Sequence, residues 1–360
     1  MGATEFALGD ALAVQIWSTS LAHEAEVRQY WRKFMGEKGD MPIQVRRELN
    51  KEAGEKITYG LRMKLSGDGV EGDNIIEGTS AEEALIFHSD AVFIDQRRKG
   101  TKSKGRMSEQ RVPYNMRKEG RDALAIWWAE DYDQQIFMYL SGARGIDTSY
   151  HVGLTYTGRA NNTLTSPEST HIVYAGNATS LADIDQADKV NLKLAEKLVA
   201  KVETLDPMIM PIRVDGENKY VWLMHTWQAY DLRTSISQGD WLEIHKATDQ
   251  KDSPIYKNSL GEYAGLVLHK HRNVVRFDST TGCASSMTAA RSLLIGAQCG
   301  CIAWGGGSEY GRYSWNEEKD DRGNALVITA GAIFGVKRTR YNSLDYGMLT
   351  VDGWCSDPTA

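Results

Sequence analysis

Alternating apolar and polar residues over positions 56–65 place the strongest constraint on how this chain folds. Apolar side chains occupy every second position from Ile57 to Leu65. Successive side chains of a β-strand point to opposite faces, so the pattern predicts a half-buried strand about 33 Å long. A second strand is predicted over residues 84–95, with a bulge near Ser89 where the apolar parity changes. Together the two strands predict an antiparallel hairpin.

The connection between these strands, residues 66–83, is much longer than the usual hairpin loop of about two to five residues. It has no Lys or Arg, and it carries these acids: Asp68, Glu71, Asp73, Glu77, Glu82 and Glu83. An isolated two-stranded hairpin is only marginally stable, and an acidic tip cannot pack along its whole length on its own domain. We therefore expect a contact outside the hairpin to hold this arm.

The opposite charge follows directly after the second predicted strand. Residues 97–106 contain no acid and carry these cations: Arg97, Arg98, Lys99, Lys102, Lys104 and Arg106. A solvated basic loop would account for this run taken alone, but the matching acidic run favours a contact. Because an arm about 30 Å long keeps its tip away from its own root, the acidic tip is predicted to meet the basic root of another copy. Such a head-to-tail contact closes into rings when it repeats around an axis.

The rest of the chain mixes helices and strands without a regular alternation. Hydrophobic periodicity predicts helices over residues 8–35, 108–140, 183–205 and 285–301, and strands over residues 209–214, 220–224, 325–336 and 346–351. The second helix is the longest, with Ser108 and Pro113 near its start and Gly142 at its end. The third predicted helix, residues 183–205, has acids in its first turns, where the positive end of the helix dipole favours them. This order of elements predicts an α+β fold.

Composition excludes several classes of protein. The 360 residues carry 42 Lys and Arg against 48 Asp and Glu, and the net charge of −6 has the wrong sign for a general binder of nucleic acid. The longest uncharged stretch, residues 292–308, is too short for a membrane-spanning helix, and the N-terminus lacks a signal-peptide pattern. Four cysteines in a chain of this length are typical of a reduced intracellular protein. We expect a protein that neither spans nor crosses a membrane.

No motif indicates catalysis or a cofactor. Cys299 and Cys301 with His269 and His271 resemble two halves of a metal site, but the cysteines end a predicted apolar helix, where free Cys behaves as a small hydrophobic residue. The glycine run at residues 305–307 lacks the Lys-Ser/Thr of a phosphate-binding loop. The sequence therefore predicts no catalytic residue, no cofactor and no metal.

Several longer stretches carry a resemblance to a known family. They are GDALAVQIWSTSL, KITYGLRMKLSGDGVEGD, SKGRMSEQRVPYNMR, RDALAIWWA, AARSLLIGAQ and GAIFGVKRTRYNSLDYG, and they are distributed over essentially the whole chain. In this order they resemble the major capsid proteins of tailed bacteriophages, specifically the family typified by enquatro-type podoviruses.

The resemblance implies the capsid fold of Hong Kong 97-type phages and herpesviruses. That fold has an N-terminal arm, an extended two-stranded loop, a peripheral domain with a long spine helix, and an axial domain. The implied boundaries are residues 1–45 for the arm, 46–98 for the extended loop, 99–150 for the peripheral domain, 151–324 for the axial domain, and 325–360 for terminal strands that return to the sheet.

The resemblance also implies a function. The chain would be a virion structural protein that assembles with itself, as hexamers and pentamers in the host cytoplasm, into an icosahedral shell around packaged double-stranded DNA. Because the sequence begins almost directly with the arm, we expect a separate scaffolding protein, unless the sequence is a mature form. Portal and decoration proteins are further expected partners, and the DNA would lie close to the shell without specific binding.

Two other functions remain open on the sequence alone. One is a soluble oligomeric enzyme with a composite site, which would sediment as a small oligomer rather than as particles or capsomers. The other is a non-viral encapsulating shell of the same fold, which a cargo-targeting partner would indicate.

Overall fold

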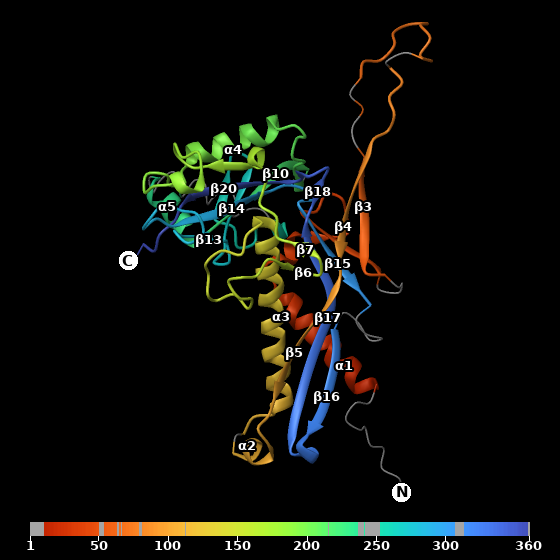
Figure 1. Ribbon diagram of the computed structural model, residues 1–360, viewed down its shortest axis with the longest axis vertical. Coiled ribbons are helices and arrows are strands. Elements are labelled where there is room, and N and C mark those ends of the chain that lie inside the picture. Colours follow the sequence, from red (N-terminus) through yellow and green to blue (C-terminus); the bar gives the residue numbers. More distant parts are fainter. Residues whose placement is uncertain are drawn as a thin grey trace.

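The computed structural model describes residues 11–49, 54–62, 65, 67–78, 81–111, 113–214, 216–236, 241, 253–306 and 313–358. The molecule has an elongated body from which a two-stranded arm projects at one end (Figure 1). Helices and strands are mixed along the chain, which confirms the predicted α+β fold. None of the helices in the described part of the chain is long and apolar enough to cross a membrane.

The first of two main sheets lies against the long helix. Within the described residues its six strands are β1 (Met35–Gly36), β2 (Ile43–Leu49), β15 (Gly300–Gly305), β17 (Ala325–Arg338), β16 (Tyr313–Asp320) and β5 (Asp95–Lys102). β17 is long enough to pair antiparallel with β15, β16 and β5. Its Ile328, Ala330 and Phe334 are buried in a core shared with α1 (Ala11–Arg28) and α3 (Met116–Ser141).

The long helix α3 confirms the prediction over residues 108–140, but it begins later. Residues of the predicted first turns form a separate short helix, α2 (Arg106–Gln110). The Asn115 side chain accepts hydrogen bonds from the backbone N–H groups of Arg117 and Lys118, which starts α3 after Pro113. Gly142, at a φ of 69°, ends the helix in the left-handed conformation that glycine adopts readily.

The second main sheet forms the other lobe of the body. Its eight strands among the described residues are β11 (Gly261–Tyr263), β12 (Leu266–Lys270), β10 (Glu217–Met224), β14 (Ala289–Ile295), β20 (Met348–Trp354), β8 (Ile172–Tyr174), β13 (Arg276–Phe277) and β9 (Ile212–Val214). Two helices, α4 (Leu192–Thr204) and α5 (Thr226–Thr234), pack on it through a second core that includes Leu198, Leu232 and Trp222. The predicted strands near residues 209–214, 220–224 and 346–351 are confirmed.

The helix predicted over residues 285–301 is wrong, because these residues form β14 and the start of β15. Every residue of β14 is buried, and the strand lies between β10 and β20. A strand that is covered on both faces carries a continuous apolar run, which periodicity cannot distinguish from a buried helix.

The third predicted helix also begins later than its acids indicate. α4 starts after Asn191, whose side chain accepts the N–H of Leu194. The preceding acids bind turn N–H groups instead of the helix end: Asp183 accepts from Thr179, and Asp188 accepts from Asn177. The predicted placement of acids in the first turns of this helix is therefore wrong.

Smaller elements complete the fold. They are the 3₁₀ turns η1 (Trp31–Phe34), η2 (Ser169–His171), η3 (Leu181–Asp183), η4 (Pro254–Tyr256) and η5 (Asp321–Gly323), and the strand pairs β6 (Gly158–Arg159) with β7 (Asn162–Thr163), β18 (Arg340–Tyr341) with β19 (Leu344–Asp345), and β3 (Lys56–Arg62) with β4 (Phe87–Phe93). Residues 8–10 of the first predicted helix, and residues 63, 64, 66, 79 and 80 of the predicted hairpin, lie outside the described residues.

Candidate subunit-contact surfaces

The projecting arm is the predicted hairpin of β3 and β4. Lys56 pairs with Phe93 at its root and Arg62 with Phe87 farther out, in one continuous register. The bulge predicted near Ser89 is absent from this pairing, since Ser89 lies opposite Gly60. The change in apolar parity instead separates the exposed Phe87, at the outer end of β4, from the buried Val92 at its root.

The root of the arm packs on the body through a small apolar cluster of its own. Ile57, Tyr59 and Val92 are buried there, whereas Phe87 at the outer end of β4 is 63% exposed. The body contributes Cys301, Ala303 and Tyr341 to this cluster. Burial of both strands at one end supplies the outside support that an isolated hairpin needs.

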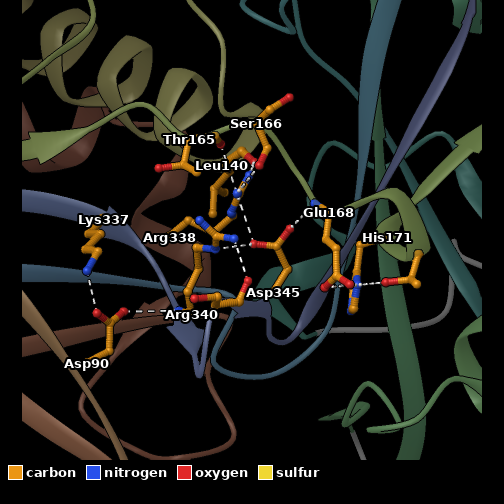
Figure 2. Close-up of polar contacts among 12 residues, drawn as sticks. Asp90, Leu140, Thr165, Ser166, Glu168, His171, Lys337, Arg338, Arg340 and Asp345 are labelled. Atoms are coloured by element: carbon orange, nitrogen blue, oxygen red, sulfur yellow. Dashed lines mark hydrogen bonds and ion pairs between the residues drawn. The ribbon is translucent and has the colours of Figure 1, made fainter. Parts of the chain in front are cut away.

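Asp90 anchors the root by polar contacts, as Figure 2 shows in part. Its carboxylate forms an ion pair with Lys337 and accepts the backbone N–H of Arg340 at 3.1 Å. The hydroxyl of Tyr59 donates to the same carboxylate at 3.1 Å. The side chain of Asp90 is only 9% exposed, so this charge is held by specific partners rather than by water.

Two further residues fix the last pair of the hairpin. The Asn162 side chain accepts the N–H of Phe93 at 3.1 Å and donates to its carbonyl at 2.7 Å, as a neighbouring strand would. Gly335 of β17 approaches the same carbonyl so closely that a Cβ there would lie 1.9 Å from the oxygen. The arm root therefore rests directly on the backbone of β17.

Beside the arm root, a buried corner ties the sheets to the C-terminal end of α3 (Figure 2). Arg338 donates to the carbonyl oxygens of Leu140 at 3.3 Å and Thr165 at 2.9 Å, and it forms an ion pair with Asp345 at 3.0 Å. Burial lowers the pKa of Arg338 to about 10, so the guanidinium stays charged at neutral pH. A cation at this position complements the negative end of the helix dipole.

A second arginine reaches the same helix end from the other sheet. Arg291 of β14 donates to the carbonyl of Ser141 at 3.2 Å and binds the Asp352 carboxylate through two hydrogen bonds, at 2.8 and 2.6 Å. Both partners of this ion pair are almost fully buried. The last turn of α3 is thus held by one buried arginine from each main sheet.

The acidic loop lies away from the body to which the arm belongs (Figure 1). All six predicted contact acids are exposed: Asp68, Glu71, Asp73, Glu77, Glu82 and Glu83. Hydrogen bonds within the loop include Asp68 with the N–H of Gly69 and Glu82 with the N–H of Gly78. The extended loop expected from the sequence is therefore confirmed, and its acids face solvent in the single subunit.

The same loop and its flanks also expose large apolar side chains, which the sequence reasoning did not identify. They are Leu65, Ile75, Ile76, Leu85, Ile86 and Phe87, with exposed fractions from 54% to 76%. The pairs Ile75-Ile76 and Leu85-Ile86 within an acidic, glycine-rich segment were the available sequence signal.

Some side chains of the predicted basic run have partners in their own chain, and others are exposed without an ion-pair partner in the described part of the chain. Arg97 forms a 2.6 Å ion pair with the buried Asp131, Lys102 pairs with Asp320, and Lys99 lies over the Trp127 ring. These residues belong to strand β5, so the alternative of a solvated basic loop is wrong for residues 97–102. Three exposed cations have no ion-pair partner among the described residues: Arg98, Lys104 and Arg106.

Comparison with known proteins identifies the family. The sequence profile of a family described as phage capsid protein matches residues 5–356. The chain belongs to this family. It is 27% identical to the major capsid protein of Pseudomonas phage KPP25, over 93% of each chain. The solved capsid of Ralstonia phage GP4 is 37% identical and covers 99% of each chain, with a TM-score of 0.86.

A more distant solved relative extends the fold comparison. The capsid of cyanophage Pam1 has a TM-score of 0.71 at 18% identity and covers 91% of this chain and 92% of its own. The chain is therefore a major capsid protein with the Hong Kong 97-type fold, a structural component of the virion that forms the phage head shell by self-association. The enzyme and the non-viral shell considered from the sequence are set aside.

Proposed function

We propose that this capsid protein builds an icosahedral shell of hexamers and pentamers around packaged double-stranded DNA, in a phage of the enquatro-type podovirus group. The observation that carries the proposal is the arm, which is anchored firmly at its root while its loop is exposed in the single subunit. The stretches KITYGLRMKLSGDGVEGD and GAIFGVKRTRYNSLDYG support the choice of group.

The two sheets support a division into the domains of this fold. We assign residues 1–45 to the N-terminal arm, 46–98 to the extended loop, 99–150 to the peripheral domain, 151–324 to the axial domain and 325–360 to the returning strands. Sheet membership favours moving β15 and β16 to the peripheral domain, because both pair within the sheet that packs on α3. β20 then returns to the axial sheet.

Assembly in this proposal is a geometric process. Each acidic arm loop contacts a basic surface on an adjacent copy, and the repeated head-to-tail contact closes a ring. Individual exposed charge pairs are weak, so a stable shell needs many such contacts in parallel. The net charge of −6 lets the inner wall confine DNA without binding it tightly.

Other phage components complete the proposed assembly. We assign this chain a separate scaffolding protein during shell formation, a portal at one vertex, and contacts with decoration proteins where the phage has them. The family resemblance supports these partners.

Shortening the arm tests the proposal. Residues 66–83 would be replaced by Asn-Gly, a sequence that favours a two-residue hairpin turn. The subunit should keep its circular dichroism spectrum and unfolding temperature, because the root cluster is untouched, and electron microscopy should find no shells. Normal shells built from the shortened chain would overturn the role given to the arm.

A further inference from the structure

We propose that the arm loop binds the spine-tip surface of an adjacent copy, and that apolar contact supplies most of the binding. We define this surface as the exposed side chains of residues 104–111 and 113–118. This inference rests on the proposed function, since it names the surface that receives the arm. It differs from simple charge matching in placing the contact on α2 and its flanks rather than on β5.

The shape of the molecule makes this a contact between copies. The arm loop lies at one end of the longest axis of the molecule, and α2 lies at the opposite end (Figure 1). A loop so placed cannot reach the spine-tip surface of its own chain. Repetition of the contact therefore joins subunits head to tail.

The arm loop offers both apolar groups and negative charge. Ile75 is 76% exposed and Ile76 is 54% exposed, with Asp73 and Glu77 on either side of them. Exposed apolar groups gathered within a polar rim mark surfaces that bind other proteins. The matching surface must therefore be apolar at its centre and basic around it.

The spine-tip surface has this composition. Met107 and Tyr114 are each 65% exposed, and Met116 is 36% exposed. Methionine adapts its shape to a partner, and tyrosine offers a large apolar face with a polar end. The same segment carries four exposed cations: Lys104, Arg106, Arg111 and Lys118. The acids of this segment are Glu109 and, just beyond it, Glu119, so the cations predominate.

The β5 segment is a poorer match for the arm loop, which requires a surface that is both apolar and basic. Arg97 and Lys102 already have carboxylate partners in their own chain, and Lys99 lies over Trp127. Among the described residues, the exposed large apolar side chains include none from β5. β5 could therefore contribute charge through Arg98 but no apolar contact.

The spine-tip surface is held in place before binding. The N–H of Arg106 donates to the Asn324 side chain at 3.2 Å, and Ser103 exchanges two hydrogen bonds with the Leu326 backbone, at 2.8 and 2.9 Å. These contacts fix α2 to β17 and its preceding turn. A surface that is already ordered loses less conformational entropy when a partner binds.

Cysteine cross-linking tests the placement directly, since the four natural cysteines are all buried. Full-length chains carrying both Ile75→Cys and Met107→Cys would be assembled and then oxidised. We expect a ladder of disulfide-linked oligomers on non-reducing gels, and only monomers when the same chains are oxidised unassembled. The matched control carries Ile75→Cys with Arg98→Cys and should give no ladder.

Each result of this experiment has a clear meaning. A ladder from the control pair alone, or shells that form without a ladder from either pair, would overturn the inference. If the unmodified chain, with its scaffolding partner, forms no shells at all, the proposed function fails before the inference is tested.

A charge exchange provides a second, independent test. Arg106→Glu, Arg111→Glu and Lys118→Glu together should reduce shell yield about tenfold or more, and added Asp68→Lys, Glu71→Lys and Asp73→Lys should restore part of it. Lys193→Glu with Lys197→Glu, on the exposed side of α4, is the control and should leave the yield unchanged. Normal yield from the triple spine-tip variant would contradict the inference.

Discussion

Asp90 connects the arm to the body through two hydrogen-bond donors, the Lys337 ammonium and the Arg340 N–H. Its ion pair with Lys337 has an exposed counterpart in the same sheet. Lys102 pairs with Asp320 at the end of β16, where both side chains are more than half exposed. The two pairs have the same chemistry and differ in their exposure to water. Comparing them therefore measures how much burial adds to the contribution of a Lys–Asp ion pair to the free energy of unfolding.

We expect Asp90→Asn to lower the free energy of unfolding by about 1–3 kcal/mol, because it leaves the Lys337 ammonium without its buried counter-ion. Asp320→Asn should produce no measurable change, since water replaces the lost partner. Urea unfolding of both variants at the same salt concentration measures the difference. Equal effects from the two substitutions would show that burial does not strengthen the contact at Asp90.

The buried Asp133 gives the subunit a dependence on pH. Its carboxyl accepts the N–H groups of Tyr30 and Trp31, yet burial raises its pKa to about 7, from 3.8. Between these values the unfolded chain releases the proton and the folded chain retains it. The stability contributed by this group is therefore complete below about pH 4 and is lost as the pH rises to about 7.

Asp133→Asn should remove this dependence. The difference in unfolding free energy between the natural chain and the variant should fall as the pH rises from about 4 to 7, by at most about 1.4 kcal/mol for each pH unit. Above pH 7 the difference should be constant. Chemical unfolding at a series of pH values measures it, and a difference that is constant throughout would contradict the raised pKa.

At the scale of elements, the junction between the arm and β17 depends on a glycine. Gly335→Ala would place a methyl group against the Phe93 carbonyl, so the arm root must move away from β17. We expect a loss of about 1–3 kcal/mol in unfolding free energy, as is usual for overpacking. Gly153→Ala, where a Cβ would have no atom within 4 Å, is the matched control. Thermal unfolding that is the same for both variants would show that the junction yields at little cost.

The elements that sequence reasoning predicted correctly are those whose pattern is local. The alternation in β3 and the long periodic face of α3 can both be recognised within a short window. Residues 285–301 could not be assigned correctly, because the side chains of β14 pack into both main cores and the strand has no solvent-exposed face. β5 was not expected as a strand, because its apolar neighbours come from β17, which lies far along the chain.

The candidate contact surface could also be predicted only where its pattern is local in the sequence. The acids of the loop and the cations near β5 could be named from the sequence, because charge is visible there. The ion pair between Arg97 and Asp131 could not, since it depends on how β5 lies against α3. Exposure of Ile75 and Met107 likewise follows only from the folded arrangement.

At the scale of the whole molecule, an apolar contact steered by charge predicts two different responses to salt. Raising the salt concentration should slow shell assembly, because exposed charges are screened over about 8–10 Å. Completed shells should persist at the same salt, because apolar burial is not screened. Light scattering can follow both processes. Completed shells that dissolve as salt is raised would indicate that charge alone holds the arm.

Arg291 and Arg338 donate hydrogen bonds to carbonyl oxygens in the last turn of α3. These contacts bear on how a closed particle would deform. Swinging the second sheet away from α3 would separate the buried Arg291 guanidinium from the carbonyl oxygen of Ser141, which costs free energy because a buried charge loses a partner. At the outer end of the arm, Phe87 is 63% exposed, and the acids of the loop are exposed as well. We therefore expect internal pressure to be accommodated by bending of the arms, while each body turns as a rigid unit.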